Sequence, residues 1–199
     1  MNKIKSWILG ALAAIGIFQY SRPPVMIDQT ITPQTSHVSV PSDGKPEVIL
    51  IEDGIKGATD AEKKVVVQSV QETNQIDRSD CFKNKILGAK FTETNGLTNQ
   101  QVYDVLATHP VSIKVEIFNG SFMQNYVYKT MGYDIGDGTV YVNRFFVKTA
   151  KQMRSLINHE AEGHQQGFHH NGVKSTSVPY QFNDFTDECG AELESLGMI

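Results

Sequence analysis

Residues 159–170 have the sequence His-Glu-Ala-Glu-Gly-His-Gln-Gln-Gly-Phe-His-His, which holds four of the six histidines in this 199-residue chain. A neutral imidazole is the commonest protein ligand for zinc, and a carboxylate beside a metal-bound water can take up its proton. Two glutamates, Glu160 and Glu162, lie in the same stretch. The stretch therefore indicates a metal-dependent hydrolase with its active site on a helix.

The second half of this stretch has a spacing that suits three-dimensional metal ligation. His164 is followed by Gly167 and then by His170. We expect His164 in the last turn of a helix and Gly167 at positive φ, where the chain can reverse. His170 would then return to the same ion from another direction, as a tetrahedral site requires.

At these positions the chain resembles the metzincin zinc peptidases, whose motif is H-E-x-x-H-x-x-G-x-x-H. His164, Gly167 and His170 match the second histidine, the glycine and the third histidine of that motif. The segment Ser-Val-Pro-Tyr at 177–180 is similar to the turn beneath the metal in this family, with proline where methionine is usual.

The resemblance implies Zn²⁺ as the cofactor and a peptide or protein as the substrate. It implies that Tyr180 is a catalytic residue, which approaches the metal or stabilises the transition state. It also implies that the strand expected at 139–147 is an edge strand, and that an extended substrate lies antiparallel to it near Tyr141 to Arg144.

The first half of the motif departs from the family pattern, because the His-Glu pair lies one residue early. On a regular α-helix His159 and His164 would be about 140° apart and could not share an ion. In the arrangement that we favour, a π-bulge absorbs the extra residue. His159, His164 and His170 then bind zinc, and Glu160 is the catalytic general base.

In the alternative arrangement the helix is regular. Glu160, His164 and His170 are then the ligands, Ala161 occupies the position of the base, and the site binds metal but hydrolyses poorly. His169 competes with His170, which we prefer on spacing. Carboxylates of the last helix (Asp187, Glu188 and Glu192) could supply a ligand, but a solvated helix face is the simpler interpretation. Histidines near a helix end can also interact with the helix dipole without any metal.

The N-terminal residues indicate export. Residues 1–22 combine Lys3 and Lys5 with the apolar run 7–18, which is shorter than the roughly 20 residues of a membrane span and fits a signal peptide. We expect a signal peptide or an N-terminal membrane anchor here, with a membrane tether through residues 7–18 in the second case. The protein is accordingly expected to be periplasmic, secreted or membrane-anchored.

Without residues 1–22 the chain has a formal net charge of −7, since three positive charges are removed from a chain of net charge −4. This charge is a poor match for nucleic acid, which we do not expect as a partner, and for anionic membrane surfaces. Residues 23–46 contain five of the seven prolines and are expected to be a linker. Residues 47–199 are expected to form the metallopeptidase-like domain.

The order of the elements predicts an α+β domain with a mixed sheet, an active-site helix and a C-terminal helix. Strands are expected at 48–51, 111–118 and 139–147, with a weaker candidate at 126–131. Helices are expected at 60–74, 80–87 and 99–108, from Thr149 into the histidines, and from Asn183 or Asp184 to 196. Cys81 and Cys189 either pair or remain two free buried thiols.

These observations favour zinc-dependent hydrolysis of peptide bonds by an exported metallopeptidase. Two other functions stay open at this point. One is an exported metal-binding or interaction module without catalysis, which the regular helix would favour. The other is a zinc hydrolase that acts on peptide or amide bonds of the cell wall.

Overall fold

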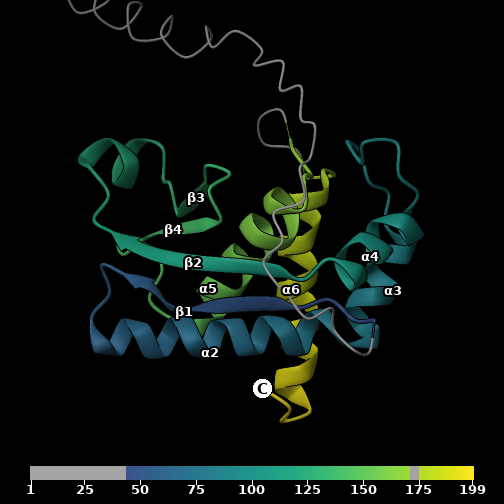
Figure 1. Cartoon of the computed structure of the whole chain (residues 1–199), viewed down its shortest axis with the longest axis horizontal. Helices are drawn as coiled ribbons and strands as arrows, with labels where there is room; N and C mark the ends of the chain where they lie inside the picture. The colour runs from purple at the N-terminus through teal and green to yellow at the C-terminus, as the bar shows by residue number, and fades with distance from the viewer. Residues whose placement is uncertain (1–43, 171–174) are drawn as a thin grey trace, which may run out of the picture. The chain divides into compact units, whose positions relative to one another are not determined.

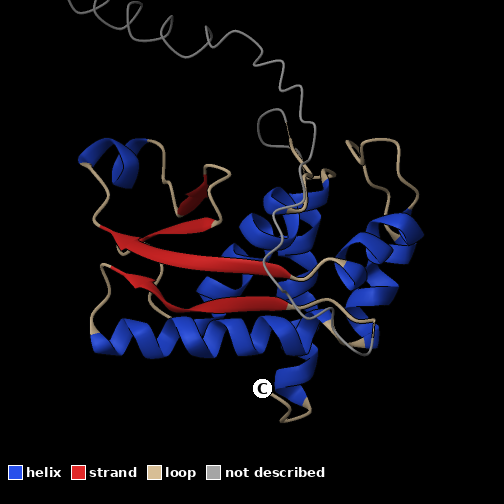
Figure 2. Cartoon of the chain, in the orientation of Figure 1, coloured by secondary structure: helices blue, strands red, loops and turns tan. Residues whose placement is uncertain are grey.

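The computed structural model describes residues 44–170 and 175–199. These residues form an α+β domain, as the sequence predicts, with a four-stranded mixed sheet and helices packed against it (Figures 1 and 2). The signal peptide or anchor predicted at 1–22 and residues 23–43 of the predicted linker lie outside the described residues. None of the described helices is long and apolar enough to cross a membrane.

The sheet has the strand order β1-β2-β4-β3. Its strands are β1 (Val48–Lys56), β2 (Val111–Phe118), β3 (Gly132–Asp134) and β4 (Thr139–Asn143). β1, β2 and β4 are parallel, and β3 is antiparallel to β4. In β2 every second residue is buried, which gives the sheet one core face.

The structure corrects the expectation that the strand at 139–147 is an edge strand. β4 ends at Asn143 and is paired on both sides, with β2 and with β3. The reason is that the chain before β4 folds back through the turn at 135–138 and adds β3 at the edge. The place for an extended substrate near Tyr141 to Arg144 was therefore wrong, and β3 has the edge position instead.

The helices begin at clear sequence signals. They are α2 (Asp60–Asp77), α3 (Asp80–Gly88), α4 (Asn99–Thr108), α5 (Ala150–Ile157) and α6 (Val178–Ser195). The side chains of Thr59, Thr98 and Thr149 cap α2, α4 and α5, and the helix expected from Thr149 begins there. α6 begins at Val178 and not near Asn183, because a helix accepts Pro179 in its first turn.

Two apolar clusters form the core of the domain. Side chains of α2 and α5 pack with the buried side chains of the sheet in the first cluster. α3, α4 and α6 form the second together with Phe168. A disulfide joins Cys81 of α3 to Cys189 of α6, with 5.8 Å between their Cα atoms, so the paired alternative is the one that the structure has.

Two segments of the described chain are π-helical. η2 (Asn158–Gln165) directly continues α5, and η1 (Met123–Val127) lies between β2 and β3. The weak strand predicted at 126–131 was wrong, because the buried Asn143 side chain binds Asn125 and the carbonyl of Thr130 and holds this segment in a non-extended form. η2 carries the histidines of the candidate site.

Candidate metal centre

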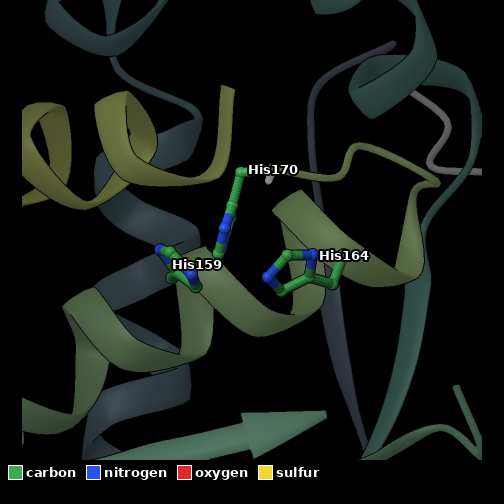
Figure 3. A group of neighbouring side chains, drawn as sticks. All are labelled: His159, His164 and His170. Carbon is green, nitrogen blue, oxygen red and sulfur yellow. The ribbon is translucent and has the colours of Figure 1, made fainter. Parts of the chain in front are cut away.

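The change from α to π winding places His159 and His164 together. In a π-helix each N–H bonds five residues back, so residues five apart lie on the same face. Figure 3 shows both imidazoles on one side of η2. The predicted π-bulge is confirmed, as a segment of eight residues rather than a single turn. The regular helix that the alternative ligand set requires is not present at 158–165.

The chain reverses after η2 and brings back His170. Gly167 has φ +85°, as predicted from its position before the return. Phe168 is then buried and packs on Phe182 of α6, with 6.2 Å between ring centroids. This contact fixes the return, and the His170 ring enters the space beside the two histidines of η2 (Figure 3).

The three imidazoles form a group that could hold a metal ion. One ring nitrogen from each of His159, His164 and His170 lies within 4.8 Å of the other two. Both nitrogens of His170 are buried and have no hydrogen-bond partner in the part of the chain that the structure describes. A buried nitrogen without a partner is costly, and coordination of a cation would satisfy it.

A hydrogen bond to the backbone orients the His164 ring. Nδ1 of His164 lies 2.9 Å from the carbonyl oxygen of Phe168. A carbonyl only accepts hydrogen bonds, so Nδ1 carries the proton and donates it. Nε2 is then the nitrogen available to a metal, and the ring is held in place by the same residue that fixes the return.

The surroundings of His159 and His164 favour the neutral form of both imidazoles. Burial lowers the pKa of His159 to about 3, and the neighbouring His164 and His170 contribute to this shift. Burial also lowers the pKa of His164. A metal binds the neutral imidazole, so the apoprotein presents these two rings in the form that binds.

Glu160 and Tyr180 lie beside the histidines. Both line a cavity of about 640 Å³ that also borders His159 and Gly132. Burial raises the pKa of Glu160 to about 7, and the charge of Asp134 adds to this shift. The Tyr180 ring packs on His159 and His170, with centroid distances of 4.8 and 4.6 Å. The structure therefore brings all five predicted site residues together.

The support behind η2 is a feature that the sequence analysis missed. Asn158 donates a hydrogen bond of 2.5 Å to the buried carboxylate of Asp77 at the end of α2. Glu162 is fully buried next to this pair, and burial raises its pKa to about 8. A Cβ on Gly163 would lie 2.8 Å from the Cβ of Pro179, so η2 and α6 touch closely there.

No periodic pattern marks these supporting residues, because they act through contacts with α2 and α6. The sequence signals for this support are Asn158, which precedes His159, and Gly163, which precedes His164. Pro179, which replaces the methionine usual in the resembled family, proves to be the residue against which Gly163 packs.

The other candidate ligands lie outside the group of three histidines, although Asp187 lines the same cavity as His159. His169 is exposed and stacks on His164 at 6.0 Å, outside the group that could share an ion. Glu188 pairs with Lys85, and Asp187 accepts a hydrogen bond from Ser155. None of the carboxylates of α6 is part of the histidine group.

Comparison of the chain with protein-family models, with curated proteins and with solved structures finds no match. The interpretation of the site therefore depends on its own geometry and on the motif resemblance.

Proposed function

We propose that this domain is a zinc-dependent peptide hydrolase. The observation that carries the proposal is the convergence of His159, His164 and His170 on one point, with Glu160 next to the first of them and a cavity alongside. This is the order of ligands and base in the metzincin motif, which the π-helical winding of η2 restores despite the extra residue.

Three histidine ligands suit Zn²⁺ in a catalytic site, where a fourth position stays open. When bound, zinc lowers the pKa of a water molecule towards neutrality and polarises a substrate carbonyl. The three imidazoles would hold it through one nitrogen each, and the proton on Nδ1 of His164 leaves Nε2 for this purpose.

Glu160 is the proposed general base. One of its carboxylate oxygens takes the proton of the attacking water and passes it to the leaving amine. A pKa of about 7 suits both steps, because a group that titrates near the working pH accepts and releases a proton readily. Tyr180 keeps its phenolic proton, since burial and the charge of Glu160 raise its pKa, and it donates a hydrogen bond to the developing oxyanion.

The proposed substrate is an extended peptide or protein chain. Gly132 of β3 lines the cavity beside Glu160, and β3 pairs only with β4 among the described residues. A strand edge that no other strand covers can bind an extended chain through its backbone groups, and at β3 the backbone of Asp134 also bonds Glu160. The export expected from residues 1–22 would make the substrate an extracytoplasmic protein or a cell-wall peptide.

The proposal is tested with the full chain, loaded with zinc, on casein and on peptidoglycan. We expect the parent to cleave casein and Glu160→Gln to lose at least about 100-fold in rate with its zinc content unchanged. Full activity of Glu160→Gln would contradict the role of this residue. A parent that binds zinc and cleaves neither substrate would contradict the proposed function and leave a metal-binding module.

A further inference from the structure

The segment around η1 presents apolar side chains to the outside. The exposed fraction is 70% for Phe122, 59% for Tyr126 and 53% for both Val127 and Tyr128. The Tyr126 ring contacts Phe122 and Phe145, with centroid distances of 5.0 and 5.3 Å. We call the group of Phe122, Met123, Tyr126, Val127, Tyr128 and Phe145 the aromatic surface. An exposed apolar group of this size marks a place of interaction.

The aromatic surface is held in place by polar contacts on its inner side. The buried amide of Asn143 accepts a hydrogen bond from the N–H of Gly120 and donates to Asn125 and to the carbonyl of Thr130, at 3.2, 2.8 and 2.9 Å. The N–H of Asn143 also bonds the carbonyl of Met131 at 2.8 Å. Polar groups thus face inward and rings face outward, and the anchored backbone keeps the rings exposed.

The aromatic surface continues into the cavity of the candidate site. Residues 128–132 line the cavity together with His159 and Glu160, so Tyr128 belongs to both. Figure 1 shows η1, between β2 and β3 in the chain, beyond the end of the sheet on the side of β3 and β4. Gly132 begins β3, and Met131 and Tyr128 precede it along the same cavity wall, so a chain bound along β3 would lead towards the aromatic surface.

We propose that the aromatic surface binds apolar side chains of the peptide substrate on one side of the cleaved bond. The inference rests on the proposed function and names its substrate class, extended chains with apolar residues near the cleavage site. A lipid surface fits less well. Membrane-docking segments carry several cations, whereas residues 121–131 hold only Lys129 and the chain without residues 1–22 has a net charge of −7.

Binding is tested with the full chain carrying Glu160→Gln, so that the probe is not cleaved. The probe is a fluorescein-labelled unstructured peptide rich in Phe and Leu. The control peptide has the same sequence with Ser at every apolar position. Adding Phe122→Ser and Tyr126→Ser should weaken binding of the apolar peptide at least about tenfold, measured by fluorescence anisotropy. The matched control, Leu196→Ser with Met198→Ser, removes two equally exposed apolar side chains at the other end of the domain and should leave the affinity unchanged.

Equal affinity of the double variant and the control would overturn the inference. Equal affinity for the apolar and the Ser-containing peptide would also overturn it. The same holds if the double variant loses binding to phosphatidylglycerol vesicles and keeps its binding of the apolar peptide. Failure of the proposed function is seen separately, since the parent would then cleave no casein even though the anisotropy differences remain. In that outcome the surface binds peptides but is not a substrate site.

Discussion

The two π-helical segments have the same winding and opposite surroundings. η2 has five buried residues, most of them polar or small, and packs on α6 and on β2 and β3 of the sheet. η1 has no buried residue, and Tyr126 within it and Phe122 and Tyr128 at its two ends are exposed. In η2 the winding directs the imidazoles of His159 and His164 to one side of the helix. In η1 the apolar side chains lie where another molecule can reach them.

The two segments are stabilised by different contacts. η2 depends on its neighbours, through Asn158 and Asp77 on one side and Gly163 and Pro179 on the other. η1 depends on the buried amide of Asn143 and on hydrogen bonds that Ser121 and Asn125 make at its start, and its outward side chains make no contribution to the core. Changes near η2 should therefore alter stability and metal binding, and changes on the outer side of η1 should alter only binding of partners.

The largest effect is expected from removing the disulfide between α3 and α6 in the second apolar cluster. Replacing Cys81 and Cys189 by Ser removes a disulfide that spans 108 residues, and should lower the free energy of unfolding by about 3–5 kcal/mol. Urea unfolding followed by circular dichroism measures this. Zinc content below the transition should not change, and equal stability of the variant and the parent would show that the disulfide does not support this core.

A smaller effect is expected where η2 touches α6. Gly163→Ala puts a Cβ against Pro179 and should cost about 1–3 kcal/mol of stability and weaken zinc binding. Combining it with Pro179→Gly should restore most of the zinc affinity, measured by competition with a chelator.

The matched control for this contact is Gly88→Ala. Gly88 ends α3, and a Cβ there would have no atom within 4 Å, so zinc affinity should stay that of the parent. If Gly163→Ala also kept the parent's affinity, close packing on Pro179 would not be what holds η2.

An ion pair near η1 gives the third prediction. Arg144, next to Asn143, bonds Glu62 at 2.6 Å, and this contact holds the pKa of Glu62 at about 2, below its ordinary 4.5. The unfolded chain therefore takes up the proton first as pH falls. The pair contributes stability that is complete above pH 4.5 and is lost as the pH falls towards 2.

Thermal unfolding across this range tests the ion pair. Glu62→Gln should cost about 1 kcal/mol at pH 7 and should show less loss of stability than the parent between pH 4.5 and 2. Parallel curves for parent and variant would contradict the assignment.

The smallest effect is expected on the outer side of η1. Phe122→Ser with Tyr126→Ser should change the free energy of unfolding by less than about 0.5 kcal/mol, because the side chains are exposed. Ile157→Ala, fully buried at the end of α5, should cost about 3 kcal/mol in the same urea titration. An equal decrease in the free energy of unfolding for both variants would show that the outer side of η1 contributes to stability as the buried core does.

The parts of the fold that could be predicted from the sequence are those with local signals. Thr98 and Thr149 mark helix starts, and alternation of apolar residues marks β2 over its whole length. The approach of His170 to His164 was predicted from their spacing around Gly167, whereas the place of His159 was predicted from the metzincin resemblance together with a π-bulge.

What could not be predicted depends on contacts between distant residues. β3 occupies the edge of the sheet because the chain reverses at 135–138 and pairs with β4. The segment before β3 is held by Asn143, which is distant in sequence from its partners Asn125 and Thr130. The start of α6 was placed too late, because its first turn contains Pro179 and an approach to Gly163 that only the folded chain shows. Local patterns give elements, and tertiary contacts decide which residues support the site.

We propose that the π-helical winding of η2 lets His159, and not Glu160, coordinate the metal. The most direct test is the zinc content of the purified full chain, for the parent and for His159→Ala and Glu160→Ala separately, after reconstitution and dialysis. We expect about one zinc per chain in the parent and in Glu160→Ala, and loss of zinc in His159→Ala. Loss of zinc in Glu160→Ala with retention in His159→Ala, or a parent that binds no zinc, would contradict it.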